Sequence, residues 1–412
     1  MAPQTVEGEI HMNRTAFVCT SIAALALLGA AAMVTIAGPL DPPAGPVTST
    51  YKTLTEVEPR IAINATNTPG DADSLFKITQ PGSYYLTGNI TGVVGKRGIE
   101  IAASGVTIDL MGFDLSGIPG MGAFDGVSAT VSNLTNITVR NGSVRAWGDE
   151  GVDLGTFSSI NSAVIDVRAS NNTDNGILTG SFSTITGCTA YQNAGNGIST
   201  FSGSTISNCT ASQNTANGIS ALNGSTITGC TAFNNTGNGI STSDACTITG
   251  CTAYQNTGNG ISTFSGSTIS NCTASFNNGN GISAFQGCTI SNCTAQFNTR
   301  DGIRVISDCL VLANACSFNG NGGDGAGIHA TGSDNRIEGN NCINNDRGID
   351  VDAAGNIIIK NTCSGNTIDW TIVANNVVGP ILDRRAPASA AINGFSAPSS
   401  LGSTDPNANF SY

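Results

Sequence analysis

The sequence predicts an all-β fold, a right-handed parallel β-helix (solenoid) of about twelve rungs of mostly 21 residues. Two observations support this prediction: a fixed 21-residue period, and three short β-rich segments within each unit. Glycine followed by isoleucine recurs at Gly176, Gly197, Gly218, Gly239, Gly260, Gly281 and Gly302. Cysteines from Cys188 to Cys293 and asparagines from Asn172 to Asn319 keep the same spacing. A fixed period of this size is typical of stacked units that contact only their neighbours.

Each repeat holds three short β-rich segments, which in one unit are 188–191, 198–200 and 204–207. Their period-two alternation indicates strands with one buried face. Asparagine and glycine at the corners tolerate the positive φ angles of tight bends. Three strands in a unit of constant length predict a parallel β-helix whose identical positions stack about 4.8 Å apart. We therefore expect the repeated isoleucines to face inward and the repeated asparagines to form a ladder of amides.

The repeat block contains almost no charged side chains. Between Asn175 and Thr299 the only charged side chain is Asp244. Such a surface has almost nothing with which to transfer protons at neutral pH. Any catalytic site is therefore expected in the flanking rungs.

Composition divides the chain into a signal peptide or N-terminal anchor (1–37), a proline-rich linker (38–50), an N-terminal cap (51–96), the β-helix (97–378) and a C-terminal tail (379–412). In the first segment a basic residue precedes an apolar, alanine-rich run, which is typical of a secretory signal. The run is also long enough to span a bilayer as an uncleaved anchor. We expect a secreted or cell-surface protein, with a membrane partner only if this segment is retained.

The net formal charge of −12 argues against nucleic acid and anionic membrane surfaces as partners. The repeats carry no signal for a particular oligomeric state.

Thirteen cysteines in an exported chain are compatible with a disulfide framework, but their pattern favours free thiols. Twelve follow the first segment and fill columns in which serine or alanine stands in other rungs. Cysteine there acts as a small core residue. Disulfides within a column are the alternative, although in-register side chains point the same way. Because the chain has no CxxC motif and no histidine near these columns, we predict no metal site and no cofactor.

Charged residues gather in the flanking rungs, directly before the rung glycine and two residues after it. The upstream patch contains Arg97, Glu100, Asp125, Glu150 and Asp153. The downstream patch contains Asp301, Arg304, His329, Arg347, Asp350 and Asp352. The structural interpretation of both patches is a set of solvated salt bridges that ends the uncharged scaffold.

The catalytic interpretation assigns acid/base chemistry to one of two sets of residues. These sets are Arg304, His329 and Asp350 downstream, and Asp125, Glu150 and Asp153 upstream. His329, Arg304 and Asp350 each stand two residues after a rung glycine. The register therefore predicts that His329 faces solvent, one rung from Arg304 and one rung from Asp350.

Outward aromatic side chains are candidates for sugar binding, because their rings can stack on sugar rings. One strand column with outward parity contains Tyr191, Phe233 and Tyr254. A corner column, expected to pack within the bend, contains Phe201, Phe264 and Phe285.

The Gly-Ile and Ile-x-x-Cys/Asn units resemble the β-helix repeats of the pectin-lyase-like superfamily, in particular exported bacterial proteins, over about residues 97–378. The resemblance implies the fold, and it implies polysaccharide lyases and glycoside hydrolases as the enzymes of the group. Its lyases use calcium-binding aspartates and an Arg or Lys base in the middle of the strand face, where this chain has Ser199 to Ser283. The hydrolase motifs Asp-Asp, Gly-His-Gly and Arg-x-Lys do not occur here.

These observations favour an exported, non-catalytic β-helix that binds a polysaccharide or cell-surface glycan, or that acts as a cell-surface structural or adhesive scaffold. The alternative is a polysaccharide lyase or glycoside hydrolase that acts through a charged patch. Two carboxyl groups about 5–10 Å apart in a groove would favour hydrolysis, whereas a shallow face would favour binding.

We predict that the chain is exported. N-terminal sequencing of the secreted protein should begin between about Met33 and Asp41, which is within the usual length of a signal. Retention of the protein in the cytoplasm would contradict the prediction.

Overall fold

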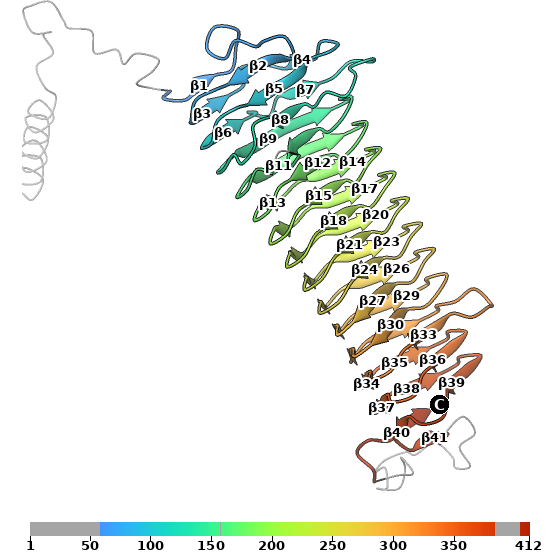
Figure 1. Ribbon diagram of the computed structural model, residues 1–412. Helices are drawn as coiled ribbons and strands as arrows, with labels where there is room; N and C mark the ends of the chain where they lie inside the picture. Colours follow the sequence, from blue (N-terminus) through green and yellow to red (C-terminus); the bar gives the residue numbers. More distant parts are fainter. Residues whose placement is uncertain (1–57, 157, 384–403) are drawn as a thin grey trace, which may run out of the picture. The chain divides into compact units, whose positions relative to one another are not determined.

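The computed structural model describes residues 58–156, 158–383 and 404–412. It confirms the predicted parallel β-helix, a stack of rungs with three strands in each regular rung (Figure 1). The predicted signal and linker lie outside the described residues. No helix long and apolar enough to cross a membrane is found in the part of the chain that the structure describes.

One face of the stack is a 14-stranded parallel sheet. Its strands are β2 (Ser74–Ile78), β5 (Arg97–Ile101), β8 (Val127–Ala129), β10 (Val152–Leu154), β12 (Ile177–Thr179), β15 (Ile198–Thr200), β18 (Ile219–Ala221), β21 (Ile240–Thr242), β24 (Ile261–Thr263), β27 (Ile282–Gln286), β30 (Ile303–Ser307), β33 (Ala326–Ala330), β36 (Arg347–Val351) and β39 (Ile368–Ile372). The sheet thus begins at β2, inside the segment predicted as a cap.

The remaining strands form a second parallel sheet that bends across the other two faces. Two long strands, β9 (Thr138–Arg145) and β11 (Ala163–Ser170), run along both faces, and β11 pairs with the two separate strands β13 (Thr184–Thr186) and β14 (Thr189–Tyr191) of the next rung. A single residue with positive φ makes this bend. Among these corner residues are Asp166, Gly187 and Asn208, types that adopt the left-handed conformation at low cost.

The end of the predicted tail also belongs to the solenoid. Strand β42 (Asn409–Ser411) pairs with β38 (Thr362–Ser364) and with β41 (Ile381–Asp383). The indole of Trp370 donates to the Ser411 hydroxyl at 3.0 Å, which anchors this last strand.

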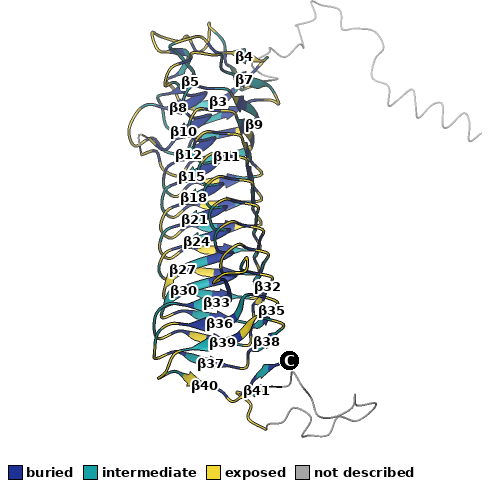
Figure 2. Cartoon of the chain, turned by 90° about the vertical axis from the view of Figure 1, so that its right-hand side faces the viewer, coloured by how far each residue is buried: buried dark blue, intermediate teal, exposed yellow. Residues whose placement is uncertain are grey.

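The core is built from stacked identical side chains. Figure 2 shows the buried residues in dark blue along the strands of successive rungs. Both predicted isoleucine columns are fully buried, for example at Ile198 and Ile206. All twelve cysteines of the described residues are buried too, as expected for core residues. Each thiol of the main column lies near backbone carbonyls, and Cys188 Sγ is 3.4 Å from the oxygens of both Val164 and Thr186. That the thiols are reduced stays a prediction.

The predicted amide ladder is confirmed. Asn235 Nδ2 donates to Asn256 Oδ1 at 3.0 Å and to the carbonyl of Ala211 at 3.1 Å. The pattern repeats from Asn172 onward, and its last amide, Asn366, donates to the Asp369 carboxylate at 3.0 Å. Every buried amide is therefore satisfied along the stack.

A second ladder, which the sequence analysis missed, occupies the position before each rung glycine. It donates in the opposite direction, so that Asn196 Nδ2 reaches Asn175 Oδ1 at 3.0 Å. Asn175 in turn donates to Glu150 Oε1 at 3.1 Å. Both ladders thus have a carboxylate at the end toward which their N–H groups point. This placement gives the terminal amide an acceptor where the asparagines stop.

Replacing one ladder amide should destabilise the fold. Asn235→Leu removes the acceptor of Asn214 and the donor to Asn256, and each buried polar group left without a partner costs roughly 1–3 kcal/mol. We expect a loss of at least about 2 kcal/mol in urea unfolding. The control is Gln213→Asn. Gln213 precedes Asn214 of the ladder but is exposed, and asparagine tolerates its positive φ angle. Equal unfolding midpoints for the two variants would contradict this role of the ladder.

Candidate functional site

The downstream patch lies on the 14-stranded sheet, where the uncharged block ends. Arg304 on β30 pairs in register with His329 on β33, and His329 pairs with Asp350 on β36. The inward neighbour Ile328 is fully buried, so His329 stands on the outer side of the sheet. The predicted register is therefore confirmed.

The downstream patch is more buried than a set of solvated salt bridges would be. The His329 side chain is 15% exposed, and Asp350 is fully buried. Arg347 contacts Asp350 Oδ2 from the same strand and also pairs with Asp324 Oδ1 at 2.5 Å. The interpretation as a solvated patch is wrong for Asp350, because its side chain is fully buried and contacts Arg347.

His329 bonds to two aspartates other than its register partner. Its Nδ1 lies 3.2 Å from Asp301 Oδ2, and its Nε2 lies 2.9 Å from Asp352 Oδ2. Burial opposes the charged imidazolium, but these two hydrogen bonds and the nearby negative charge raise the pKa of His329 to about 9. Both ring nitrogens are occupied by carboxylates, so neither is free to take a proton from a substrate. The geometry thus gives the predicted catalytic set of Arg304, His329 and Asp350 no free base.

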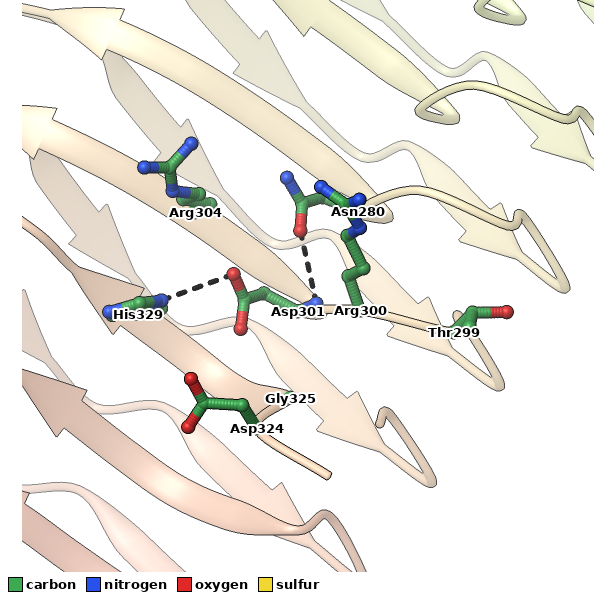
Figure 3. A pocket seen from close by; sticks show the side chains of 8 residues that line it. All are labelled: Asn280, Thr299, Arg300, Asp301, Arg304, Asp324, Gly325 and His329. Carbon is green, nitrogen blue, oxygen red and sulfur yellow. Dashed lines mark hydrogen bonds and ion pairs between the residues drawn. The ribbon is translucent and has the colours of Figure 1, made fainter. Parts of the chain in front are cut away.

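A pocket of about 380 Å³ opens beside His329. It is lined by Asn280, Thr299, Arg300, Asp301, Arg304, Asp324, Gly325 and His329. Figure 3 shows Asp301 turned toward His329 while its backbone N–H donates to Asn280. Among the ion pairs of the described residues, none involves Arg300 or Arg304. The pocket therefore offers two guanidinium groups without an acidic partner.

A second hollow of about 230 Å³ shares Arg304 and is bordered by Phe264, Phe285 and Ile306. The two rings are 56% and 45% exposed, with centroids 6.1 Å apart. The expectation that this column packs within the corner is wrong for these two residues, because the bend holds them on its outer side, where they contact each other. Exposed apolar surface thus lies next to the unpaired guanidinium.

The strand column proposed for sugar binding has the predicted outward parity. Tyr191 is 38% exposed, and the inward neighbour Ala190 is buried. Phe233 and Tyr254 stack face to face, with centroids 5.0 Å apart and planes 5° apart. Because a sugar stacks on a ring face, this pair has only its two outer faces available.

The sequence analysis did not identify a longer column of stacked aromatic rings. Phe276, Phe297 and Phe318 stack with centroids 4.8 Å apart, and all three are exposed. Each has a φ angle near 55°, which is an unusual conformation for a bulky residue. Their 21-residue spacing was visible in the sequence and could have revealed the column.

The carboxyl groups of the upstream patch are buried, and Asp149 adjoins them. Oxygens of Asp125, Asp149 and Glu150 lie within 4.8 Å of one another, and Asp125 and Glu150 are each 7% exposed. Burial together with neighbouring acids raises the pKa of Glu150 to about 9 and that of Asp125 to about 6. Asp153 accepts the backbone N–H groups of Gly155 and Thr156 at 2.9 Å, so it holds a turn. The burial leaves these side chains little room to contact a sugar chain.

We predict that Glu150 makes stability depend on pH. The pKa of its carboxyl rises from 4.5 to about 9 on folding. Its protonated form thus stabilises the fold fully below about pH 4.5, and this contribution is lost as the pH rises toward about 9. Glu150→Gln keeps an acceptor for Asn175 and cannot ionise.

Thermal unfolding should show the variant more stable than the native chain by at least about 1.4 kcal/mol near pH 9, with a much smaller difference near pH 5, since each pKa unit of the shift corresponds to about 1.4 kcal/mol. Glu338→Gln is the control, because Arg336 and Lys360 lower the pKa of that carboxyl. The same gain in both variants would argue against the assignment.

The sequence profile described as the right handed beta helix region matches residues 86–228, 202–289 and 284–379. The chain therefore belongs to the right-handed β-helix family, as the resemblance implied. Proteins of curated function give no match.

Solved structures show a similar fold at low sequence identity. The A-module of the Azotobacter vinelandii mannuronan C-5 epimerase AlgE4 is 16% identical, with a TM-score of 0.46, over 73% of this chain and 91% of that one. The periplasmic alginate epimerase AlgG is 12% identical, with a TM-score of 0.37, over 76% and 83%. The Dettilon tailspike protein is 16% identical, with a TM-score of 0.36, over 70% and 58%. This likeness concerns the fold alone.

Proposed function

We propose that this chain is an exported, non-catalytic β-helix protein that binds an acidic polysaccharide at the downstream end of its 14-stranded sheet. The observation that carries the proposal is the pair of guanidinium groups of Arg300 and Arg304. Both line the 380 Å³ pocket, and neither has an ion-pair partner among the described residues. In a chain with a net charge of −12 such groups are scarce.

The surroundings of Arg304 favour a sugar with a carboxylate or sulfate group. A guanidinium binds such groups through two parallel hydrogen bonds. The exposed rings of Phe264 and Phe285 border the adjacent hollow, where an apolar sugar face can pack. Ser262 and Ser283 line the same hollow and supply hydroxyl groups.

Binding without catalysis fits the hydrogen bonds of the site. A lyase needs a base at the sugar ring, yet both nitrogens of His329 face aspartates. A hydrolase needs two accessible carboxyl groups on either side of a bond, yet Asp125 and Glu150 are more than nine-tenths buried. Export, inferred from residues 1–37, would bring the protein to extracellular polysaccharides.

We predict that Arg304→Ser, which restores the residue found at Ser283 of the preceding rung, weakens binding to a polyuronate by about tenfold or more, because a hydrogen bond to a charged group contributes roughly 1.5–3 kcal/mol. Binding is measured by calorimetry with a polyuronate and a neutral glucan, and release of reducing ends and unsaturated products is followed in parallel.

The control is Arg168→Ser on the second sheet, which should bind like the native chain. Equal binding by both variants would contradict the site. Product release by the native chain would replace the proposal with an enzyme.

A further inference from the structure

His329 has two aspartates of the next rung beside it, Asp350 in register and Asp352 at hydrogen-bond distance. Ligand atoms of His329, Asp350 and Asp352 all lie within 4.8 Å of one another. The three residues come from β33, β36 and the position directly after β36, so adjacent rungs bring them together. His329 Nε2 and Asp352 Oδ2 are 2.9 Å apart, so an ion bound by both would displace the proton that joins them.

One carboxylate oxygen of these three residues has no hydrogen-bond partner. Asp350 Oδ1 is buried and has no hydrogen-bond partner, although Asp350 Oδ2 is held by Arg347. A buried carboxylate oxygen without a partner is costly. This oxygen belongs to the side chain that pairs in register with His329. A cation between the two residues would supply the missing contact.

The other side of His329 has the arrangement that metal-binding histidines need. Asp301 Oδ2 accepts from Nδ1 at 3.2 Å, while Asp301 Oδ1 accepts the backbone N–H of Ala326 at 2.9 Å. Asp301 is thus held in place by the backbone of Ala326, and it in turn orients the imidazole of His329. Metal-ligating histidines almost always donate their second N–H to a carboxylate or carbonyl in this way, which directs the remaining nitrogen to the metal.

The local charge also favours a cation. The four carboxylates of this region face three guanidinium groups, which leaves one negative charge when His329 is neutral. The carboxylates are Asp301, Asp324, Asp350 and Asp352, and the guanidinium groups are those of Arg300, Arg304 and Arg347. A bound cation offsets this excess of negative charge. The side chain of Asp352 is 53% exposed, so an ion can enter from solvent.

We propose that His329 Nε2, Asp350 Oδ1 and Asp352 Oδ2 bind a first-row divalent transition metal such as Zn²⁺, with Asp301 as the positioning residue of His329. One imidazole and two carboxylates suit zinc, with bonds of about 2.0–2.2 Å. Calcium fits poorly, because it takes 6–8 oxygen ligands. Three protein ligands leave a fourth position of the tetrahedral ion open. The metal site is independent of the proposed glycan binding.

The test titrates the full exported chain, first stripped of metal, with Zn²⁺ alone by calorimetry near neutral pH, and repeats the titration with Ca²⁺. Co²⁺ is added separately, because its visible absorption reports the number and type of ligands. We expect one equivalent of Zn²⁺ and no comparable Ca²⁺ binding. Asp352→Asn, at an exposed position, should weaken Zn²⁺ binding without affecting folding. Asp301→Asn should weaken it by about 10–100-fold, as loss of the group that orients a ligand does.

Asp334→Asn is the matched control, since this aspartate lies outside the cluster and its positive φ tolerates asparagine. Circular dichroism of each metal-free variant checks the fold. Undiminished Zn²⁺ affinity in Asp352→Asn, tighter binding of Ca²⁺ than of Zn²⁺, or a Co²⁺ spectrum with thiolate charge-transfer bands would overturn the proposal. Arg304→Ser should leave Zn²⁺ binding intact, which separates failure of this site from failure of glycan binding.

Discussion

Hydrogen bonding along the stack is the constraint on which the rest of this structure depends. In a parallel β-helix a buried polar side chain has its own copies above and below it, so it must be satisfied by them. Asparagine meets this condition because one amide both donates and accepts, as Asn235 does between Asn214 and Asn256. Serine, threonine and cysteine meet it less completely, and the thiol of Cys188 lies against carbonyls instead.

The same constraint explains where charge is placed. A ladder of donors must end on an acceptor, and Asp369 and Glu150 provide it at the ends of two ladders that run in opposite directions. At the other end of the Glu150 ladder, Asp301 accepts the backbone N–H of Ala326 and also holds His329. The charged groups of the downstream patch therefore begin where the amides stop. Asp301 therefore both takes the place of the amides at the end of the ladder and belongs to the candidate site.

Next to Asp301, where the asparagine ladder ends, the molecule has features that the repeat block lacks. Arg300 and Arg304 are unpaired among the ion pairs of the described residues, and an exposed aromatic pair borders the second hollow. The aspartates around His329 occupy both ring nitrogens, which favours binding over proton transfer. The buried oxygen of Asp350 adds a position that a metal ion would fill. Anion recognition and cation binding are then separate properties of neighbouring rungs.

The sequence by itself determined the parallel β-helix, the inward columns and the register of His329 with Arg304 and Asp350, because a constant 21-residue period places equal positions above one another. It could not show that Asp350 is fully buried or that His329 bonds to Asp301 and Asp352. Those contacts depend on side-chain direction across rungs. Only the tertiary structure decided them, since periodicity sets which side of a strand a residue faces and the neighbouring side chains set what it contacts.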